Sequence, residues 1–126
     1  MFYRHIKGQY FLNTRYQEWD SISGMKIAAN ISVSMVDACH IVPFSQSYDD
    51  TITNGISLCP NLHRAFDRGL VSIDHNYKVL VKSTWREEQS QYSIKQFEGK
   101  QIILPSNSSQ HPSPENLHSH RKRFDF

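Results

Sequence analysis

Short apolar segments bounded by turn residues dominate the first half of the chain. Residues 35–42 are apolar and partly β-branched and stop before Pro43, which is typical of a β-strand. Residues 56–58 predict a return strand, because they follow Asn54-Gly55, a dipeptide suited to tight turns. The polar residues between them, 45–54, are expected to form a loop. The pattern therefore predicts two neighbouring strands joined by a long polar loop.

A short helix is expected to follow the second strand. Pro60 has the backbone geometry of a first helical turn, and residues 61–68 continue from it. Gly69 can adopt the left-handed conformation in which many helices end. The order strand, loop, strand and helix is thereby predicted for residues 35–69.

Further elements are predicted on both sides of this unit. Apolar positions at an imperfect helical spacing favour an N-terminal helix over residues 2–19, followed by a turn at residues 21–24. Residues 70–73 and 79–81 predict an extra β-hairpin, and residues 102–104 predict a strand of another. These additions would cover a core formed by the central strands and helix.

A C-terminal helix is predicted to begin after Ser113. The hydroxyl of Ser113 can cap it, Pro114 fits its first turn, and Glu115 favours the positive end of the helix dipole. One face of this helix would carry Leu117, His120, Arg121 and Phe124. Helices and strands are interspersed, so the predicted fold class is α+β.

The composition is that of one ordinary folded domain. Hydrophobic residues make up 38% of the 126 positions and charged residues 21%, which disfavours a disordered chain. No apolar run approaches the roughly 18 residues of a membrane span, and the N-terminal residues lack a signal-peptide pattern. A cytoplasmic protein with no membrane partner is expected. The net charge of +2 permits nucleic-acid binding without requiring it.

Three polar residues could meet in one cleft of this layout. His40 lies near the end of the first strand, Asn54 at the end of the loop, and His63 in the first turn of the short helix. Phosphodiester hydrolysis needs a base that activates water and a cation that neutralises the phosphate. A neutral histidine can be the base, and a second imidazole can bind a divalent metal. The amide of Asn54 can orient the base or hold the loop.

The segments VDACHIVPFS (36–45) and NGISLCPNLHRAFDRGL (54–70) frame these three positions. They resemble the HNH endonucleases, and within them the restriction-associated branch. That branch has His-Ile-x-Pro, then Asn-Gly-x-x-Leu, then Leu-His-x-x-Phe-Asp-x-Gly-Leu, and the chain meets every fixed position. Matching residues at 22–24 and 97–105 extend the resemblance from about Trp19 to Phe126.

This resemblance implies one HNH nuclease domain over residues 1–126 with a ββα-metal (His-Me finger) fold. Its core would span about residues 35–83, with a C-terminal extension at residues 97–126. The implied reaction is metal-dependent hydrolysis of DNA that leaves a 5′-phosphate and a 3′-hydroxyl. By position, His40 is the general base, His63 a ligand of the single metal ion, and Asn54 a support for the loop and the base. The implied cofactor is Mg²⁺, with Mn²⁺, Ni²⁺ or Zn²⁺ as alternatives.

One departure from the family pattern concerns the metal. Many HNH nucleases carry Asp or His immediately before the base as a second ligand, whereas this chain has Cys39, a thiol ill matched to a hard cation. Asp37 lies two residues back and is expected on the same strand face. Asp67 follows His63 by one helical turn and lies on its side. We therefore expect Asp37 to substitute as a metal ligand, with Asp67 as a further candidate.

Two other features have no expected role in catalysis. Asp20 stands where relatives often carry a cysteine before the turn at residues 22–24, and the sequence assigns it no function. Cys59 lacks a second cysteine at Leu62, so a four-cysteine structural zinc site is excluded on ligand count.

Basic residues near the predicted cleft are candidates for contacts with DNA. Arg64 and Arg68 flank the cleft, and Arg121 belongs to the basic run at residues 118–123. Such residues can bind phosphates without selecting a sequence. The alternatives are an ion pair of Asp67 with Arg64 or Arg68, which we favour for Asp67, and a solvated basic face on the terminal helix.

No recognisable module for reading DNA sequence is present in the chain. Site choice would then come from a homodimer, from a separate recognition subunit or from a longer parent protein. The alternative functions are a catalytically impaired HNH-fold protein that binds DNA, an interaction module on the same scaffold, and a nonspecific ribonuclease.

Overall fold

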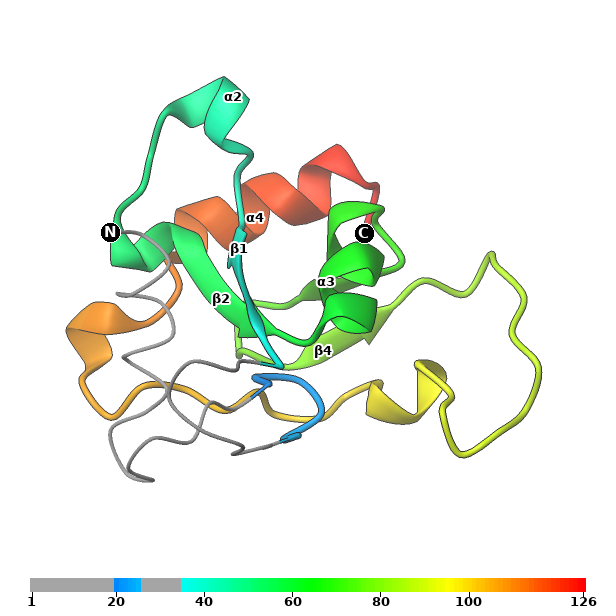
Figure 1. Ribbon diagram of the computed structural model, residues 1–126. Helices are drawn as coiled ribbons and strands as arrows, with labels where there is room; N and C mark the ends of the chain where they lie inside the picture. The colour runs from blue at the N-terminus through cyan, green and yellow to red at the C-terminus, as the bar shows by residue number, and fades with distance from the viewer. Residues whose placement is uncertain (1–19, 26–34) are drawn as a thin grey trace.

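The computed structural model describes residues 20–25 and 35–126 (Figure 1). The helix predicted over residues 2–19 lies outside the described residues. The first elements are β1 (Asp37–His40), the one-turn helix α2 (Phe44–Ser47), the 3-10 turn η1 (Ile52–Asn54), β2 (Gly55–Leu58) and α3 (Pro60–Asp67). They are followed by β3 (Val71–Ile73), β4 (Val79–Val81), the 3-10 turns η2 (Lys95–Phe97) and η3 (Ser108–Gln110), and α4 (Pro114–Arg123). The predicted α+β class is confirmed.

The central unit is a β-hairpin followed by a helix, as predicted. β1 and β2 pair antiparallel, with Asp37 opposite Leu58 and His40 opposite Gly55. The loop between them, predicted without regular structure, contains the short helix α2. Cys39 on β1 is fully buried, whereas its neighbours Ala38 and His40 are half-buried.

The hydrophobic core lies between the β1–β2 hairpin, α3, the β3–β4 hairpin and α4 (Figure 1). Helix α3 buries Leu62, Ala65 and Phe66 in it. Because residues three and four apart share a helix face, burial of these three leaves His63 and Asp67 together on a flank. The buried hydrophobic residues of the core include Cys39, Ile41, Ile56, Leu58, Leu62, Phe66, Val71, Ile73, Val79, Ile102 and Leu117.

The end of α3 is fixed by Gly69. Its φ of +72° is a left-handed conformation, and a Cβ at this position would lie 2.2 Å from the Phe124 ring. The amide of Leu70 then donates to the carbonyl of Ala65 at 2.8 Å. Gly69 thus ends the helix, as predicted, and allows the terminal segment to pack directly against the backbone.

Asp20 has a structural role that its place in the sequence did not reveal. Its buried carboxylate accepts the backbone amides of Ile22 at 2.8 Å, Ser23 at 2.7 Å and Cys59 at 2.5 Å. The first two bonds close the predicted turn, in which Gly24 has a φ of +74°. The third joins that turn to the residue immediately before α3.

Two predictions about the C-terminal half need correction. Residues 102–104 form no strand, since Ile102 donates to Tyr77 while Ile103 donates to Ser21, and the pairing is reduced to an isolated bridge between Lys78 and Gln101. The described residues therefore contain one extra hairpin, β3–β4, rather than several. The segment alternates between partners, which prevents a continuous ladder.

The C-terminal helix begins where the sequence predicts. The hydroxyl of Ser113 accepts the amide of Asn116 at 3.3 Å, and Pro114 occupies the first turn. Leu117 and His120 are both 1% exposed. Helix α4 thus buries the predicted face against the core. None of the helices within residues 20–25 and 35–126 has the length and apolar character that crossing a membrane would require.

His120 is a neutral histidine that joins α4 to α3. Its ring stacks on Phe66 with centroids 3.7 Å apart. Nε2 lies 2.8 Å from the carbonyl of Phe66, to which it must donate, so Nδ1 accepts from the Ser72 hydroxyl at 2.7 Å. Burial lowers the pKa of His120 to about 4. Protonation of Nδ1 would place an N–H donor against the Ser72 hydroxyl and a positive charge in the hydrophobic core.

We expect His120 to make the fold sensitive to acid. Its pKa is lower in the folded chain, so the unfolded chain binds more protons between about pH 6.5 and 4. The free energy of unfolding should therefore fall as the pH drops through this window. Urea unfolding followed by fluorescence at several pH values measures this slope. His120→Gln should flatten it, whereas the exposed control His118→Gln should keep the wild-type slope; equal slopes in all three proteins would contradict the assignment.

Candidate active site

His40 lies at the end of β1 with its ring beside the loop that follows. Its Nε2 is 2.7 Å from Oδ1 of Asp50, and its side chain is 28% exposed. Asp50 is an acceptor, so Nε2 carries a proton in this contact. The ring also lies 5.7 Å from that of Phe44. His40 is thus held in one orientation while still reachable from solvent.

Asn54 holds the two ends of this loop together. Its side-chain oxygen accepts the amide of Val42 at 2.9 Å, while Nδ2 donates to the carbonyls of Val42 at 3.0 Å and Asp49 at 2.9 Å. The residue is fully buried. These bonds position the residues just after His40 and just before Asp50. The sequence left two roles open for Asn54, orienting the base or holding the loop. Its side-chain hydrogen bonds fit the second role.

His63 lies between two carboxylates. Its Nδ1 is 2.9 Å from Oδ2 of Asp37 on β1, and its Nε2 is 3.1 Å from Oδ2 of Asp67 one helical turn later. The hydrogen bond to Asp67 raises the pKa of His63 to about 9, against partial burial and with further help from Asp37. Although burial acts in the opposite direction, the bond to His63 holds the pKa of Asp67 below its usual value. His63 is therefore an imidazolium at neutral pH, donating to both carboxylates.

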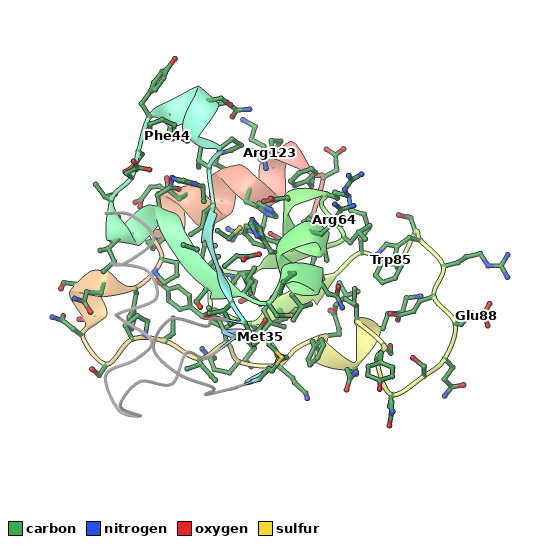
Figure 2. All side chains as sticks on the ribbon, viewed as in Figure 1. Met35, Phe44, Arg64, Trp85, Glu88 and Arg123 are labelled. Atoms are coloured by element: carbon green, nitrogen blue, oxygen red, sulfur yellow. The ribbon has the colours of Figure 1, made fainter. Side chains whose placement is uncertain are left out.

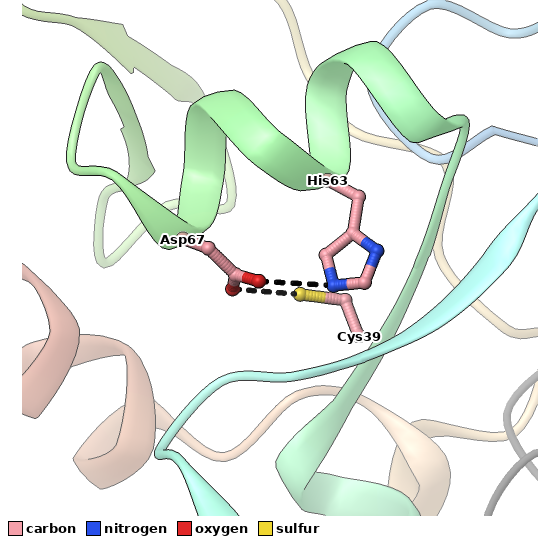
Figure 3. Close-up of side chains that lie close together, drawn as sticks. All are labelled: Cys39, His63 and Asp67. Atoms are coloured by element: carbon pink, nitrogen blue, oxygen red, sulfur yellow. Dashed lines mark hydrogen bonds and ion pairs between the residues drawn. The ribbon is translucent and has the colours of Figure 1, made fainter.

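Cys39 lies next to this pair, and Figure 3 shows its sulfur linked to the Asp67 carboxylate. Its Sγ is 3.6 Å from Oδ1 of Asp67, and the residue is fully buried. Burial raises the pKa of Cys39 well above its usual value, and the negative charge of Asp67 adds to this effect. The residue is thus a neutral thiol that donates to the carboxylate. Within residues 20–25 and 35–126, the ion-pair partner of Asp67 is His63, so the favoured pairing with Arg64 or Arg68 is not what the structure shows.

Donor atoms of Cys39, His63 and Asp67 all lie within 4.8 Å of one another. An imidazole and a carboxylate at this separation fit a divalent cation. The imidazole makes this group better suited to Mn²⁺, Ni²⁺ or Zn²⁺ than to Mg²⁺, which prefers oxygen ligands and keeps its water, whereas the neutral thiol of Cys39 adds no ligand. Asp37 lies at the other nitrogen of His63, on the side away from Asp67.

His63 and Asp67 line two neighbouring cavities. The first, of about 390 Å³, also contains His40, Phe44 and Arg123. The second, of about 400 Å³, also contains the predicted residues Asp37, Arg64 and Arg68. The structure therefore brings His40, His63 and Asp67 to one cavity and places both predicted arginines in the other.

Arg121 lies away from both cavities. Its guanidinium donates to the carbonyl of Ile73 at 2.7 Å and fastens α4 to β3. Sequence reasoning missed Asp50 and did not single out Arg123. Asp50 gave no signal, because it lies in a polar loop among several similar residues. Arg123 belongs to the recognised basic run, but only the docking of α4 shows which of its members faces the site.

A β-hairpin followed by a helix, with a histidine on each, is the ββα arrangement expected of metal-dependent nucleases. The family model for HNH endonucleases matches residues 20–74. No curated protein matches the chain in a sequence comparison. The solved structure titled "Modification dependent TagI restriction endonuclease" is similar, with a TM-score of 0.66 and 19% identity over 98% of this chain.

This structural similarity concerns the fold, and the chain covers 37% of the length of that restriction endonuclease. The match to the family model includes β1, β2 and α3, which carry His40, Asn54 and His63. Residues 20–74 of the chain therefore match the HNH endonuclease family. The resemblance inferred from the sequence is confirmed.

Removing the side chain of Asn54 should weaken the fold and the site together. Asn54→Ala would leave Val42 and Asp49 with unpaired backbone groups, which we expect to lower the free energy of unfolding by roughly 2–4 kcal/mol. Urea unfolding measures the loss. The exposed residue Asn61 on α3 provides a control, and Asn61→Ala should change stability little. Equal stabilities of the two variants would show that the loop does not depend on Asn54.

Proposed function

We propose that this domain hydrolyses phosphodiester bonds of DNA with the help of one divalent metal ion. The main support is the meeting of His40 with the His63–Asp67 pair in one cavity of about 390 Å³. A base and a cation-binding group on either side of a phosphate are what such hydrolysis requires. DNA as the substrate is supported by the family match and by the restriction endonuclease of similar fold.

His40 is the proposed general base, and Asp50 the residue that orients it. The bond from Nε2–H to Asp50 fixes the tautomer in which Nδ1 accepts the proton of the attacking water. The negative charge of Asp50 would stabilise the imidazolium that forms. Asn54 contributes by holding the loop that carries this carboxylate.

His63 Nε2 and the carboxylate of Asp67 are the proposed metal ligands. When bound, the cation would neutralise the phosphate and stabilise the leaving oxygen. Asp37 was predicted as a ligand from its strand face, but its contact with Nδ1 supports a different role, that of holding the His63 ring. The donor set shifts our preference from Mg²⁺ to Mn²⁺, Ni²⁺ or Zn²⁺.

Arg64 and Arg68 are proposed to bind phosphates that flank the reacting one, because they line the adjacent cavity. Arg121 is withdrawn from the DNA contacts, since its guanidinium is committed to Ile73. Choice of a DNA site would come from a second copy, a recognition subunit or further domains. The similar restriction endonuclease, of which this chain covers 37%, is consistent with such an organisation.

Nicking of supercoiled plasmid tests the proposed function. The wild-type domain should nick DNA in Mn²⁺ or Ni²⁺ and stop in EDTA, and His40→Ala should lower the rate at least about 100-fold. The exposed residue His75 on the β3–β4 turn gives the control, and His75→Ala should cut like the wild type. Metal-independent cutting, or equal rates in the two variants, would refute the proposed roles. DNA binding without cutting in any metal would identify a catalytically impaired binder.

Metal affinity should separate the roles of the two aspartates. We expect Asp67→Asn, which removes a ligand, to weaken Mn²⁺ binding by about 100-fold, and Asp37→Asn, which loosens the ring, by about 10-fold. Titration calorimetry measures both constants. Glu88 is an exposed carboxylate on the projecting loop (Figure 2), and Glu88→Gln should bind Mn²⁺ like the wild type. A larger loss in Asp37→Asn than in Asp67→Asn would reverse the assignment.

A further inference from the structure

One cation of the terminal basic run shares a cavity with the proposed base. Arg123, at the end of α4, lines the cavity of about 390 Å³ together with His40, Phe44, His63 and Asp67. Figure 2 shows the labelled Arg123 at the end of α4 and Phe44 on α2. Helix α4 is remote from α2 and α3 in sequence, so this meeting is produced by the fold alone.

The backbone of Arg123 is held in place by its neighbours on both sides. One helical turn earlier, His120 stacks on Phe66 and bonds to its carbonyl, and Arg121 bonds to Ile73. Immediately after it, Phe124 packs on Gly69, and the Lys82 ammonium donates to the carbonyl of Phe124. These contacts anchor the last turn of α4, so the guanidinium starts from a fixed position at the edge of the cavity.

The guanidinium lies against an aromatic ring rather than against a carboxylate. Arg123 stacks over the ring of Phe124, with the guanidinium carbon 4.6 Å from the centroid. Among the residues within 20–25 and 35–126, it forms no ion pair with Asp67 or Asp37, so its donors are not occupied by the acidic side of the site.

The charges in the cavity explain what this cation would do. Asp67 lines this cavity and Asp37 lies next to it, so two carboxylates oppose the entry of an anionic phosphodiester. Arg64 and Arg68 line the other cavity, which shares His63 and Asp67 with this one. Arg123 is the arginine that lines the same cavity as the base.

We propose that Arg123 binds the scissile phosphate through its guanidinium and stabilises the charge that develops on its oxygens during hydrolysis, an inference that rests on the proposed nuclease function. A planar guanidinium can hold two phosphate oxygens at once, a geometry that lysine cannot reproduce. Arg123 would then bind the reacting phosphate, whereas Arg64 and Arg68 bind its neighbours along the strand.

A substrate with a single phosphodiester separates these two roles. Bis(p-nitrophenyl) phosphate has no flanking phosphates, so its hydrolysis reports on contacts to the reacting phosphate alone, and we expect Arg123→Ala to lower its kcat by roughly 100-fold. Added guanidinium should restore part of the rate of Arg123→Ala, which a purely structural role of Arg123 would not allow. On long DNA, Arg64→Ala should instead weaken binding and lower its salt dependence.

The adjacent residue Lys122 provides a matched control, since it has the same charge on the same exposed helix end but does not line the cavity. Lys122→Ala should hydrolyse the small substrate like the wild type. If Arg123→Ala loses no more activity than Lys122→Ala, or if guanidinium restores nothing, the inference is overturned.

Failure of the proposed function itself has a separate signature. A wild-type domain that cannot hydrolyse either substrate in any metal is no phosphodiesterase. In that case, titration with the dinucleotide thymidylyl-thymidine, followed by NMR, still decides about Arg123. Weaker binding by Arg123→Ala than by Lys122→Ala would uphold it as a phosphate-binding residue, and equal binding would overturn it.

Discussion

The stack of His120 on Phe66 is the contact through which the terminal helix joins the central hairpin-and-helix unit. Phe66 is buried in the core on α3, and its carbonyl accepts Nε2–H of the histidine at 2.8 Å. The residue after Phe66 is Asp67, and the residue one turn after His120 is Arg123. This packed contact therefore lies close in sequence to both an acidic and a basic group of the site. It also requires that His120 stay neutral, because an imidazolium there would be desolvated against a ring and a hydroxyl.

The charges of the site balance around His63. His63 contacts both carboxylates and so brings Asp37 and Asp67 close together. A divalent cation bound at Nε2 of His63 would replace a proton of charge +1 with an ion of charge +2. The hydrogen bond between Nδ1 and Asp37 would keep the ring in place. The buried thiol of Cys39 contributes no charge, so this arrangement tolerates cysteine where an acidic ligand is usual. In the proposed function, Asp67 rather than Asp37 would then complete the metal site from the helix.

The sequence was sufficient to predict the central fold because its signals there are local. Pro60 and Gly69 mark the ends of α3, and Ser113 marks the start of α4, each through backbone chemistry that needs no tertiary context. The strand predicted at residues 102–104 was wrong, because an apolar run indicates burial and burial alone does not produce a strand. Asp20 could not be interpreted for a related reason, since its most distant partner is the amide of Cys59.

The site was predictable to the extent that its residues share a motif. His40, Asn54 and His63 follow from their spacing, but the functions of charged side chains depend on which neighbour each one meets. Arg121 and Arg123 cannot be told apart from their positions in a basic run. In the structure, Arg121 bonds to Ile73 on β3, whereas Arg123 lines a cavity. The face of α4 that packs against the core decides between them, because Arg121 follows the buried His120 directly whereas Arg123 lies at the exposed end of the helix. The close packing of Phe124 on Gly69, where any side chain would push Phe124 away, holds that end in place.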